Sequence, residues 1–384
     1  MSGEGRTISN MTRRSMRRAS VVCAAAALFA SATPAVSAHA DPTRPPVAEA
    51  WQQSTSARLR TDGSLSDVVA VSATEVWAVG QQEIWDVWQN RGVITRWDGK
   101  AWTQVPIRND ATGAGHLRSV AAAGPGQMWT VGDGHDGQPY IARGDANGFD
   151  RVTVDELRSG DWLGGVAAAQ GKVVAVGSRE GKPLVVARDG GSWTLTPMKN
   201  RGVLYGVALS AKGDGWAVGD TAGQPLVMRL SSGEWKRVSL PSVPGGYLRD
   251  IHVDSPRRAL AVGGVFRGPG DVTPLVMAWN GKRWSEVDVP DGDAKLYGVS
   301  GDGKGRFWIS GADPGRPTEP FLMRFEHGKG KIIRGTAGAK GSTVRLQAVT
   351  SVPGTSAVWS VGHIVDSADR YTDVVKRFGG PSDR

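Results

Sequence analysis

The sequence is poor in the residues that most often mark enzyme chemistry. It has a single cysteine, Cys23, and six widely scattered histidines. One cysteine cannot form an intramolecular disulfide, and distant histidines without cysteine do not indicate a zinc site. Helix signals are scarce, and no glycine-rich phosphate loop leads into a helix. These absences argue against thiol, zinc and nucleotide chemistry.

Positive charge is modest and dispersed along the chain. The formal net charge is +9, and the first 40 residues contribute five arginines and one glutamate to it. Elsewhere lysine and arginine form groups no longer than a short pair, whereas nucleic-acid-binding domains carry basic clusters. We therefore expect no nucleic-acid partner. No stretch after the amino-terminal region is apolar for long enough to span a membrane.

The first 40 residues have the pattern of a secretory signal peptide. A basic region, an apolar region and a small-residue cleavage motif follow one another: arginines 13, 14, 17 and 18, residues 19–32, and Ala38-His39-Ala40. We expect cleavage after Ala40, loss of Cys23 with the signal, and a secreted, extracellular protein. Residues 12–16 (Thr-Arg-Arg-Ser-Met) are similar to a twin-arginine signal, so both export routes stay open.

A four-residue phrase that ends in glycine occurs seven times, and five of its copies begin with tryptophan. The seven glycines are Gly80, Gly132, Gly177, Gly219, Gly263, Gly311 and Gly362. Successive glycines lie between 42 and 52 residues apart. A strand-rich repeat of about 40–50 residues is typical of a β-propeller with one repeat per blade. The fold class predicted from the sequence is therefore all-β, a seven-bladed β-propeller over residues 41–378.

Each repeat contains four short apolar runs, which predicts four-stranded antiparallel blades. The first run begins with leucine, the second is the glycine phrase, the third often opens with proline, and the fourth carries another tryptophan. The last repeat has no fourth run. We expect residues 48–53, around Trp51, to pair with the last blade and close the ring, which leaves no open sheet edge there. We expect residues 379–384 to form a frayed tail.

The repeat resembles the tryptophan-rich propellers of secreted actinobacterial proteins, and more distantly the kelch and Asp-box propellers. The Asp-box pattern is similar to residues 95–102, but here Asp98 directly precedes Gly99. The kelch double glycine is missing. The resemblance covers residues 48–378 and implies a propeller scaffold. Its motifs are structural, so it implies no catalytic residue.

Residues that depart from the repeat are the best candidates for function. Loops between the second and third strands vary most in length, and variable loops on a rigid scaffold often carry binding sites. The side chains beside the first-strand leucines point to the same face. The predicted ligand-binding residues are Trp85, Trp88, His116, Arg118, Trp162, Tyr205, Tyr247, Arg249, Tyr297 and Arg345.

Aromatic rings beside cationic groups suit a sugar face or an acidic glycan. The sequence thus favours a non-catalytic, monomeric binding module for an extracellular glycan or protein. A polysaccharide hydrolase would need two facing carboxylates, which one sequence does not single out, and a lyase could use His116 or His363. No cofactor is predicted. Calcium is an alternative in the loops of Asp133 and Asp136 and of Asp366, Asp369 and Asp373, although such residues are also common in plain turns.

Overall fold

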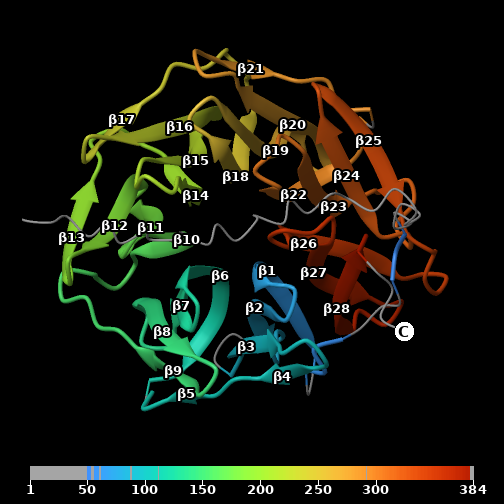
Figure 1. Ribbon diagram of the computed structural model, residues 1–384, viewed down its shortest axis with the longest axis horizontal. Coiled ribbons are helices and arrows are strands. Elements are labelled where there is room, and N and C mark those ends of the chain that lie inside the picture. Colours follow the sequence, from blue (N-terminus) through green and yellow to red (C-terminus); the bar gives the residue numbers. More distant parts are fainter. Residues whose placement is uncertain are drawn as a thin grey trace, which may run out of the picture. The chain divides into compact units, whose positions relative to one another are not determined.

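The computed structural model describes residues 50–52, 56–59, 62–86, 89–110, 112–290 and 292–380. The predicted signal peptide, residues 1–40, and the end of the predicted tail, residues 381–384, lie outside these ranges. Within them the chain forms seven sheets in a ring, and the predicted all-β propeller is confirmed (Figure 1). No helix that could span a membrane occurs in this part of the chain.

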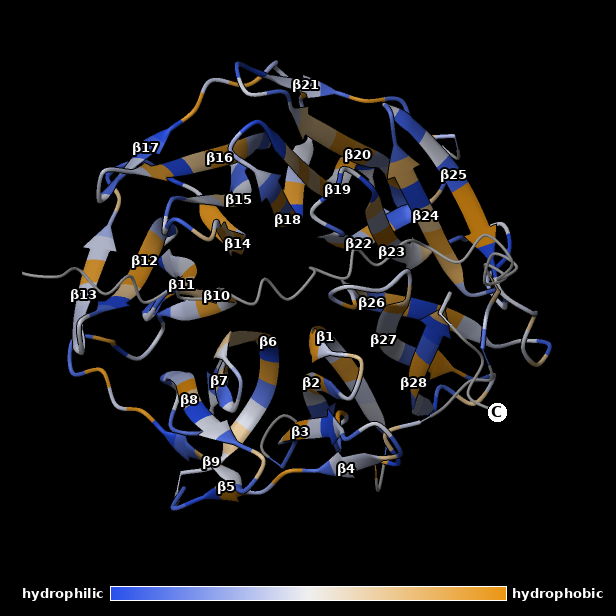
Figure 2. Cartoon of the chain, viewed as in Figure 1, coloured by the Kyte–Doolittle hydropathy of each residue, from blue (hydrophilic) through white to orange (hydrophobic). Residues whose placement is uncertain are grey.

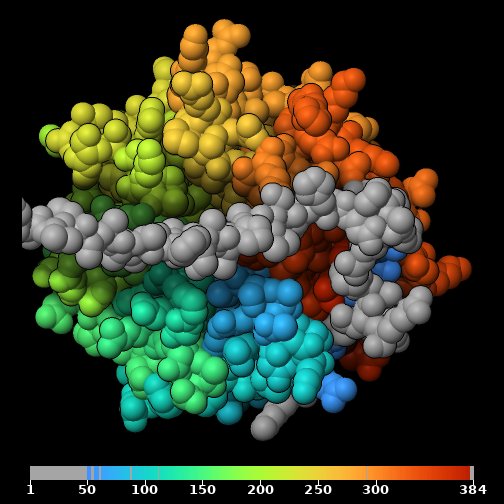
Figure 3. Space-filling model, in the orientation of Figure 1, coloured from blue at the N-terminus to red at the C-terminus, as the bar shows by residue number. Residues whose placement is uncertain are grey.

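The blades follow one another around the ring in chain order, from blue to red (Figure 3). Blades 1 to 3 contain β1 (Gly63–Ser72), β2 (Glu75–Gln82), β3 (Arg91–Trp97), β4 (Trp102–Gln104); β5 (Ile107–Arg108), β6 (Ala114–Gly124), β7 (Gln127–Gly134), β8 (Pro139–Asp145), β9 (Gly148–Arg151); β10 (Trp162–Ala169), β11 (Lys172–Arg179), β12 (Lys182–Asp189) and β13 (Ser192–Pro197). Blades 4 and 5 contain β14 (Val203–Leu209), β15 (Gly215–Thr221), β16 (Gln224–Ser231), β17 (Glu234–Arg237); β18 (Gly246–Ser255), β19 (Arg258–Gly268), β20 (Asp271–Trp279) and β21 (Trp284–Glu286). Blades 6 and 7 contain β22 (Lys295–Gly301), β23 (Phe307–Ala312), β24 (Phe321–Glu326), β25 (Lys329–Arg334); β26 (Thr343–Ser351), β27 (Val358–Val365) and β28 (Tyr371–Phe378).

Two blades depart from the simple four-stranded pattern. In blade 2, the short strand β5 adds to the outer edge parallel to β9. Blade 7 has three strands, and Trp51 forms one antiparallel bridge with Phe378 of β28. The Gly379 amide donates to the Ala50 carbonyl over 3.0 Å. The described part of the predicted closing segment therefore makes a single bridge, and residues 48, 49 and 53 lie outside the described ranges.

Aromatic contacts join consecutive blades in a repeated direction. Trp216 of blade 4 packs against Trp279 and Trp284 of blade 5, with ring centroids 5.0 and 5.3 Å apart. Trp359 of blade 7 makes the same pair of contacts with Trp97 and Trp102 of blade 1. Each second-strand tryptophan thus fills the space between its own blade and the next. Figure 2 shows apolar residues along the strands of the blades.

The arginine that ends several third strands supports this packing. The Arg229 guanidinium lies over the Trp216 ring at 5.2 Å, and Arg377 lies over Trp359 at 5.4 Å. Arg96 lies over Trp77 in blade 1 at 5.6 Å. Such cation–π contacts explain the recurrence of arginine at these positions without a ring of anion-binding sites.

The innermost pair of strands has a β-bulge at the same place in all seven blades. The register between first and second strands shifts just after the repeated leucine. One residue per blade is therefore displaced from the ladder: Ser66, Arg118, Gly164, Tyr205, Arg249, Tyr297 and Gln347. A bulge bends its strand and changes the direction of a side chain. Here it occurs on the strands that surround the ring axis.

The glycine of the repeated phrase lies opposite the leucine and makes this bulge possible. A Cβ atom on Gly177 would lie 1.7 Å from the Trp162 carbonyl oxygen. At the six equivalent glycines the nearest backbone oxygen would lie between 1.8 and 2.1 Å away. Only glycine allows this approach of two backbones.

We expect Gly177→Ala to destabilise the fold by about 3 kcal/mol, because the added methyl group must displace the β10 backbone. The measurement is urea unfolding followed by tryptophan fluorescence. Gly124→Ala is a matched control, since no atom lies within 4 Å of a Cβ at Gly124. The control should change stability by less than about 0.5 kcal/mol. Equal stability of both variants and the parent would contradict the role given to the glycine phrase.

Candidate functional site

A cavity of about 1340 Å³ lies at the ring axis, lined by the first strands of all seven blades. The bulges bring the predicted site residues together in it. Eight of the ten line the cavity: Trp85, His116, Arg118, Trp162, Tyr205, Tyr247, Arg249 and Tyr297. Arg345 is exposed on β26 and does not belong to the lining. Trp88 lies outside the described residues.

One arc of the cavity wall is a chain of contacts across blades 2 to 4. Arg118 forms an ion pair with Asp133, and its guanidinium lies 5.4 Å from the centroid of Trp162. Trp162 meets Tyr205 edge-on at 5.8 Å, and the Tyr205 hydroxyl donates to Asp220 over 2.7 Å. Burial raises the pKa of Tyr205, and the hydrogen bond to Asp220 adds to this rise. Contacts within the protein therefore hold this arc together.

Trp162 is less available than the sequence suggested. Its ring lies against Gly164, where a Cβ atom would come within 2.3 Å of the indole. Gly164 is the bulged residue of blade 3, so the indole takes the space that a bulged side chain fills in most blades. With Arg118 also over the ring, Trp162 acts more as a wall than as a free stacking surface.

Two serine–histidine pairs occupy the next part of the wall. The Ser66 hydroxyl lies 2.7 Å from Nε2 of His116, and Arg118 lies 3.1 Å from Nδ1 of the same ring. A guanidinium can only donate, so Nδ1 accepts and Nε2 carries the proton. Burial lowers the pKa of His116 to about 3, and the Arg118 charge adds to this effect. The neutral imidazole donates to Ser66 and cannot accept its proton as a general base would.

The second pair lies between blades 1 and 7. Ser64 lies 2.7 Å from Nδ1 of His363, and burial lowers the pKa of this histidine to about 4. The ring of Tyr371 is tilted against the His363 ring, with centroids 5.0 Å apart, and meets Trp85 edge-on at 5.4 Å. Tyr371 was not predicted as a site residue, because its strand position gives no hint that it contacts a loop tryptophan of another blade.

The third arc comes from blades 5 and 6. Arg249 lies over the Tyr297 ring at 4.9 Å, and Tyr247 stands two residues before Arg249 on β18. Phe266, at the end of the long β19–β20 hairpin, also lines the cavity. Phe266 and Trp85 are the large hydrophobic side chains recorded as exposed in the described ranges, at 54% and 63%. Both therefore lie at the same cavity.

Two aspartates that line the cavity, Asp67 and Asp250, were not predicted as site residues. Asp67 accepts hydrogen bonds from Ser119 and from the Val120 amide of blade 2, at 2.8 and 2.9 Å. Asp250 accepts from the Val299 amide of blade 6 at 2.8 Å. Other blades have serine, glycine or alanine at this place. Aspartate in place of these small residues was the signal by which the sequence could have revealed them. Their hydrogen bonds link neighbouring blades.

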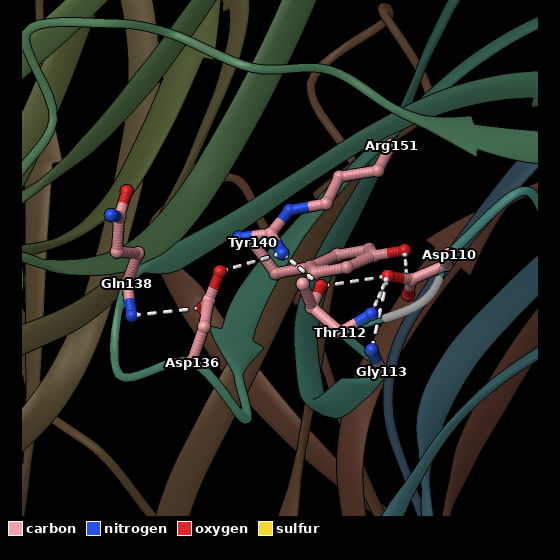
Figure 4. Close-up of polar contacts among 7 residues, drawn as sticks. All are labelled: Asp110, Thr112, Gly113, Asp136, Gln138, Tyr140 and Arg151. Carbon is pink, nitrogen blue, oxygen red and sulfur yellow. Dashed lines mark hydrogen bonds and ion pairs between the residues drawn. The ribbon is translucent and has the colours of Figure 1, made fainter.

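Most carboxylates of the candidate calcium loops already have cationic or hydrogen-bonding partners. Figure 4 shows Arg151 between Asp136 and Thr112, over the Tyr140 ring. The Arg151–Asp136 ion pair has a distance of 2.8 Å. The Tyr140 hydroxyl donates to Asp110 over 2.7 Å, which ties the loop before β6 to blade 2. In the other loop, Asp366 pairs with Arg370, and Asp373 accepts hydrogen bonds from Ser56, Ala57 and Leu59. These contacts give the loops a structural role.

Solved structures share this fold at low sequence identity. YCF48 bound to a D1 peptide is 14% identical, covers 88% of this chain and 99% of its own, and gives a TM-score of 0.56. YCF48 from Cyanidioschyzon merolae is 13% identical over 86% and 98%, with a TM-score of 0.53. The extracellular domain assigned to the hybrid two component system BT4673 from B. thetaiotaomicron is 10% identical over 84% of this chain and 39% of its own, with a TM-score of 0.56. No family model and no curated protein matches the sequence. At these identities the similarity establishes the propeller fold alone.

Asp67 and Asp250 lead us to predict a specific pH dependence of stability. Burial raises the pKa of Asp67 to about 7, and the charge of Asp250 adds to the rise. Folding then favours the protonated form, so the contribution of Asp67 is complete below about pH 4 and is lost as pH rises to 7. The stability of Asp67→Asn relative to the parent should rise between pH 4.5 and pH 8, by at most about 4 kcal/mol.

Urea unfolding of both proteins across this range tests the prediction. Only the difference between them isolates Asp67, because His116 and His363 act in the opposite sense. Their lowered pKa values make the parent lose stability as pH falls below about 6.5. A stability difference that stays constant with pH would show that Asp67 is ionised in the folded protein throughout.

Proposed function

We propose that this protein is a secreted, monomeric binding module that binds an extracellular glycan in the axial cavity. The observation that carries the proposal is the position of Trp85 and Phe266. Ligand pockets are commonly lined by aromatic side chains with a few polar groups among them, and exposed rings in such a lining are available for contact. Here the two rings stand next to tyrosines and arginines that also line the cavity.

The side chains that line the cavity suit the binding of sugars. Pyranose rings present C–H faces that stack on aromatic rings, and their hydroxyl groups need polar partners nearby. The cavity provides both within one space, because polar residues such as Ser66 and Arg249 and aromatic residues such as Tyr205 and Tyr297 line it together. The fixed contacts of Arg118, Trp162 and Tyr205 mean that little ordering is needed on binding, which favours affinity.

An extracellular protein is the second candidate partner. YCF48, which shares the fold, is seen bound to a peptide, and this supports a protein ligand as the alternative. A polysaccharide hydrolase or lyase has weaker support. His116 is not placed as a base toward Ser66, and Asp133, Asp136, Asp220, Asp366 and Asp373 all have hydrogen-bond or ion-pair partners.

We expect Trp85→Ala and Phe266→Ala each to weaken glycan binding by about 3- to 10-fold, since an aromatic contact is worth about 0.5–1.5 kcal/mol. A glycan array followed by calorimetry on the hits measures the effect. Both side chains are exposed, so thermal stability should not change. Lys236→Ala on β17, at the outer edge of blade 4, is a control that should bind like the parent. Retained affinity in both aromatic variants would place the site elsewhere.

Secretion is a separate part of the proposal. It is supported by the signal-like pattern of the first 40 residues and by the resemblance to secreted actinobacterial propellers. Expression of the full chain in a secreting bacterial host should yield protein in the medium whose amino terminus is Asp41. Mass spectrometry of the secreted protein tests this. Retention of the uncleaved chain inside the cell would contradict it.

A further inference from the structure

Arg249 is a cation of the cavity lining that forms no ion pair with the residues the structure describes. It is exposed, it lines the cavity, and its contact in the described part of the chain is the face of Tyr297 at 4.9 Å. No carboxylate of the described residues forms an ion pair with it. Stacking on the tyrosine fixes the plane of the guanidinium while its N–H groups stay available for a ligand.

At the equivalent bulge of blade 2, the guanidinium of Arg118 has partners within the protein. Arg118 pairs with Asp133, contacts His116 and stacks on Trp162. Its charge is therefore neutralised within the protein. Arg249 stands at the same place in blade 5, next to the same cavity, without that neutralisation. The difference between the two blades indicates that the charge of Arg249 serves a ligand.

Two tyrosines line the cavity beside this arginine: Tyr297, whose ring carries the guanidinium, and Tyr247, two residues before Arg249 on β18. Tyr247 is half-buried, and its ring lies over Gly264, where a Cβ atom would be 2.8 Å from the hydroxyl oxygen. Tyr297 is half-buried beneath Arg249. Neither hydroxyl donates a hydrogen bond to another described residue, whereas the Tyr205 hydroxyl is used by Asp220. All three residues line the cavity, so the guanidinium and the two hydroxyl groups are candidate donors for one acceptor there.

We propose that Arg249, Tyr247 and Tyr297 bind the carboxylate of an acidic sugar unit. The inference rests on the proposed function and names its ligand class. A planar guanidinium matches the two oxygens of a carboxylate, and phenolic hydroxyls can donate to the same group. Uronic acid units in polysaccharides carry such a carboxylate directly on a pyranose ring.

The aromatic ring at the end of the same blade favours a sugar over a peptide. Phe266 lies on the β19–β20 hairpin, two register positions beyond the Tyr247–Gly264 pair, and is more than half exposed. A uronic acid unit presents its carboxylate and its C–H face on one rigid ring, so blade 5 can contact both. A peptide carboxylate is carried on a flexible chain and gains less from a fixed apolar plate beside the anion site.

Calorimetry with three probes tests the proposal: a hexamer of galacturonate, its fully methyl-esterified form, and a hexamer of glutamate. We expect the parent to bind the galacturonate hexamer at least tenfold more tightly than either of the others. Arg249→Gln should remove at least tenfold of that affinity, because a charge-assisted bidentate contact is lost. Arg249→Lys should recover part of it, since the charge remains without the planar fork.

Arg267→Gln is the matched control. Arg267 is an exposed arginine that follows Phe266 on β19, and it does not line the cavity. The Arg267→Gln variant should bind galacturonate like the parent. This control distinguishes a specific contact of Arg249 from general attraction between an anionic ligand and a positively charged protein. Thermal unfolding of each variant verifies that the fold is intact.

The outcomes distinguish this inference from the proposed function. Equal binding of the galacturonate hexamer and its ester, with the effects of Trp85 and Phe266 retained, would overturn the carboxylate site and leave the glycan-binding module. Tighter binding of the glutamate hexamer, or no binding of the galacturonate hexamer, would overturn the acidic-sugar assignment. An Arg249→Gln variant with unchanged affinity for galacturonate would exclude this group as the anion site.

Discussion

The approach of two backbones at the repeated glycine is the constraint on which the rest of the structure depends. In each blade a carbonyl oxygen of the first strand occupies the space of the missing side chain, as the Trp162 carbonyl does at Gly177. This contact allows the inner strand to bulge. Since the bulge is the same in all seven blades, one residue per blade leaves the ladder at the equivalent position, and six of these seven residues carry a side chain. The cavity lining follows from a glycine that never touches the cavity.

Two further sets of contacts keep the seven bulges in register. At the outer radius, second-strand tryptophans pack into the next blade, as Trp216 does between Trp279 and Trp284. At the inner radius, polar groups cross between first strands, as Asp67 does to Val120 and Thr350 to Ala70. Where no polar group crosses, glycine lets the backbones meet, as at Gly206. A blade in a closed ring contacts two neighbours, so these links stabilise every blade from both sides.

The sequence predicted the fold well because the repeat carries strong structural signals. Glycine phrases, strand-opening prolines and paired tryptophans follow from backbone and packing requirements that act locally or between adjacent blades. Position in the repeat predicted that Tyr205, Arg249 and Tyr297 lie close together, and all three stand at bulges that line the cavity. That they bind a ligand stays a prediction. The sequence was less informative about contacts between distant parts of the chain. No local pattern shows that Gly164 and Arg118 enclose Trp162, that Asp133 neutralises Arg118, or that Tyr371 reaches Trp85.

The bulged position separates the requirements of folding from those of binding. Leucine before it and the small or linking residue after it are held by the core and by the next blade. The bulged side chain itself projects into the cavity and packs against no repeated partner, and the seven blades accordingly carry serine, arginine, glycine, tyrosine, arginine, tyrosine and glutamine there. A substitution at such a place changes the chemistry of the cavity lining, and it costs stability where the side chain has a partner, as Arg118 has Asp133 and Tyr205 has Asp220. Blade 3 is the exception that supports this argument: its bulged residue is glycine because Trp162, one residue before the leucine, fills the vacated space. The repeat therefore does not set the residue type at the bulge, and the proposed ligand site lies where the seven blades differ.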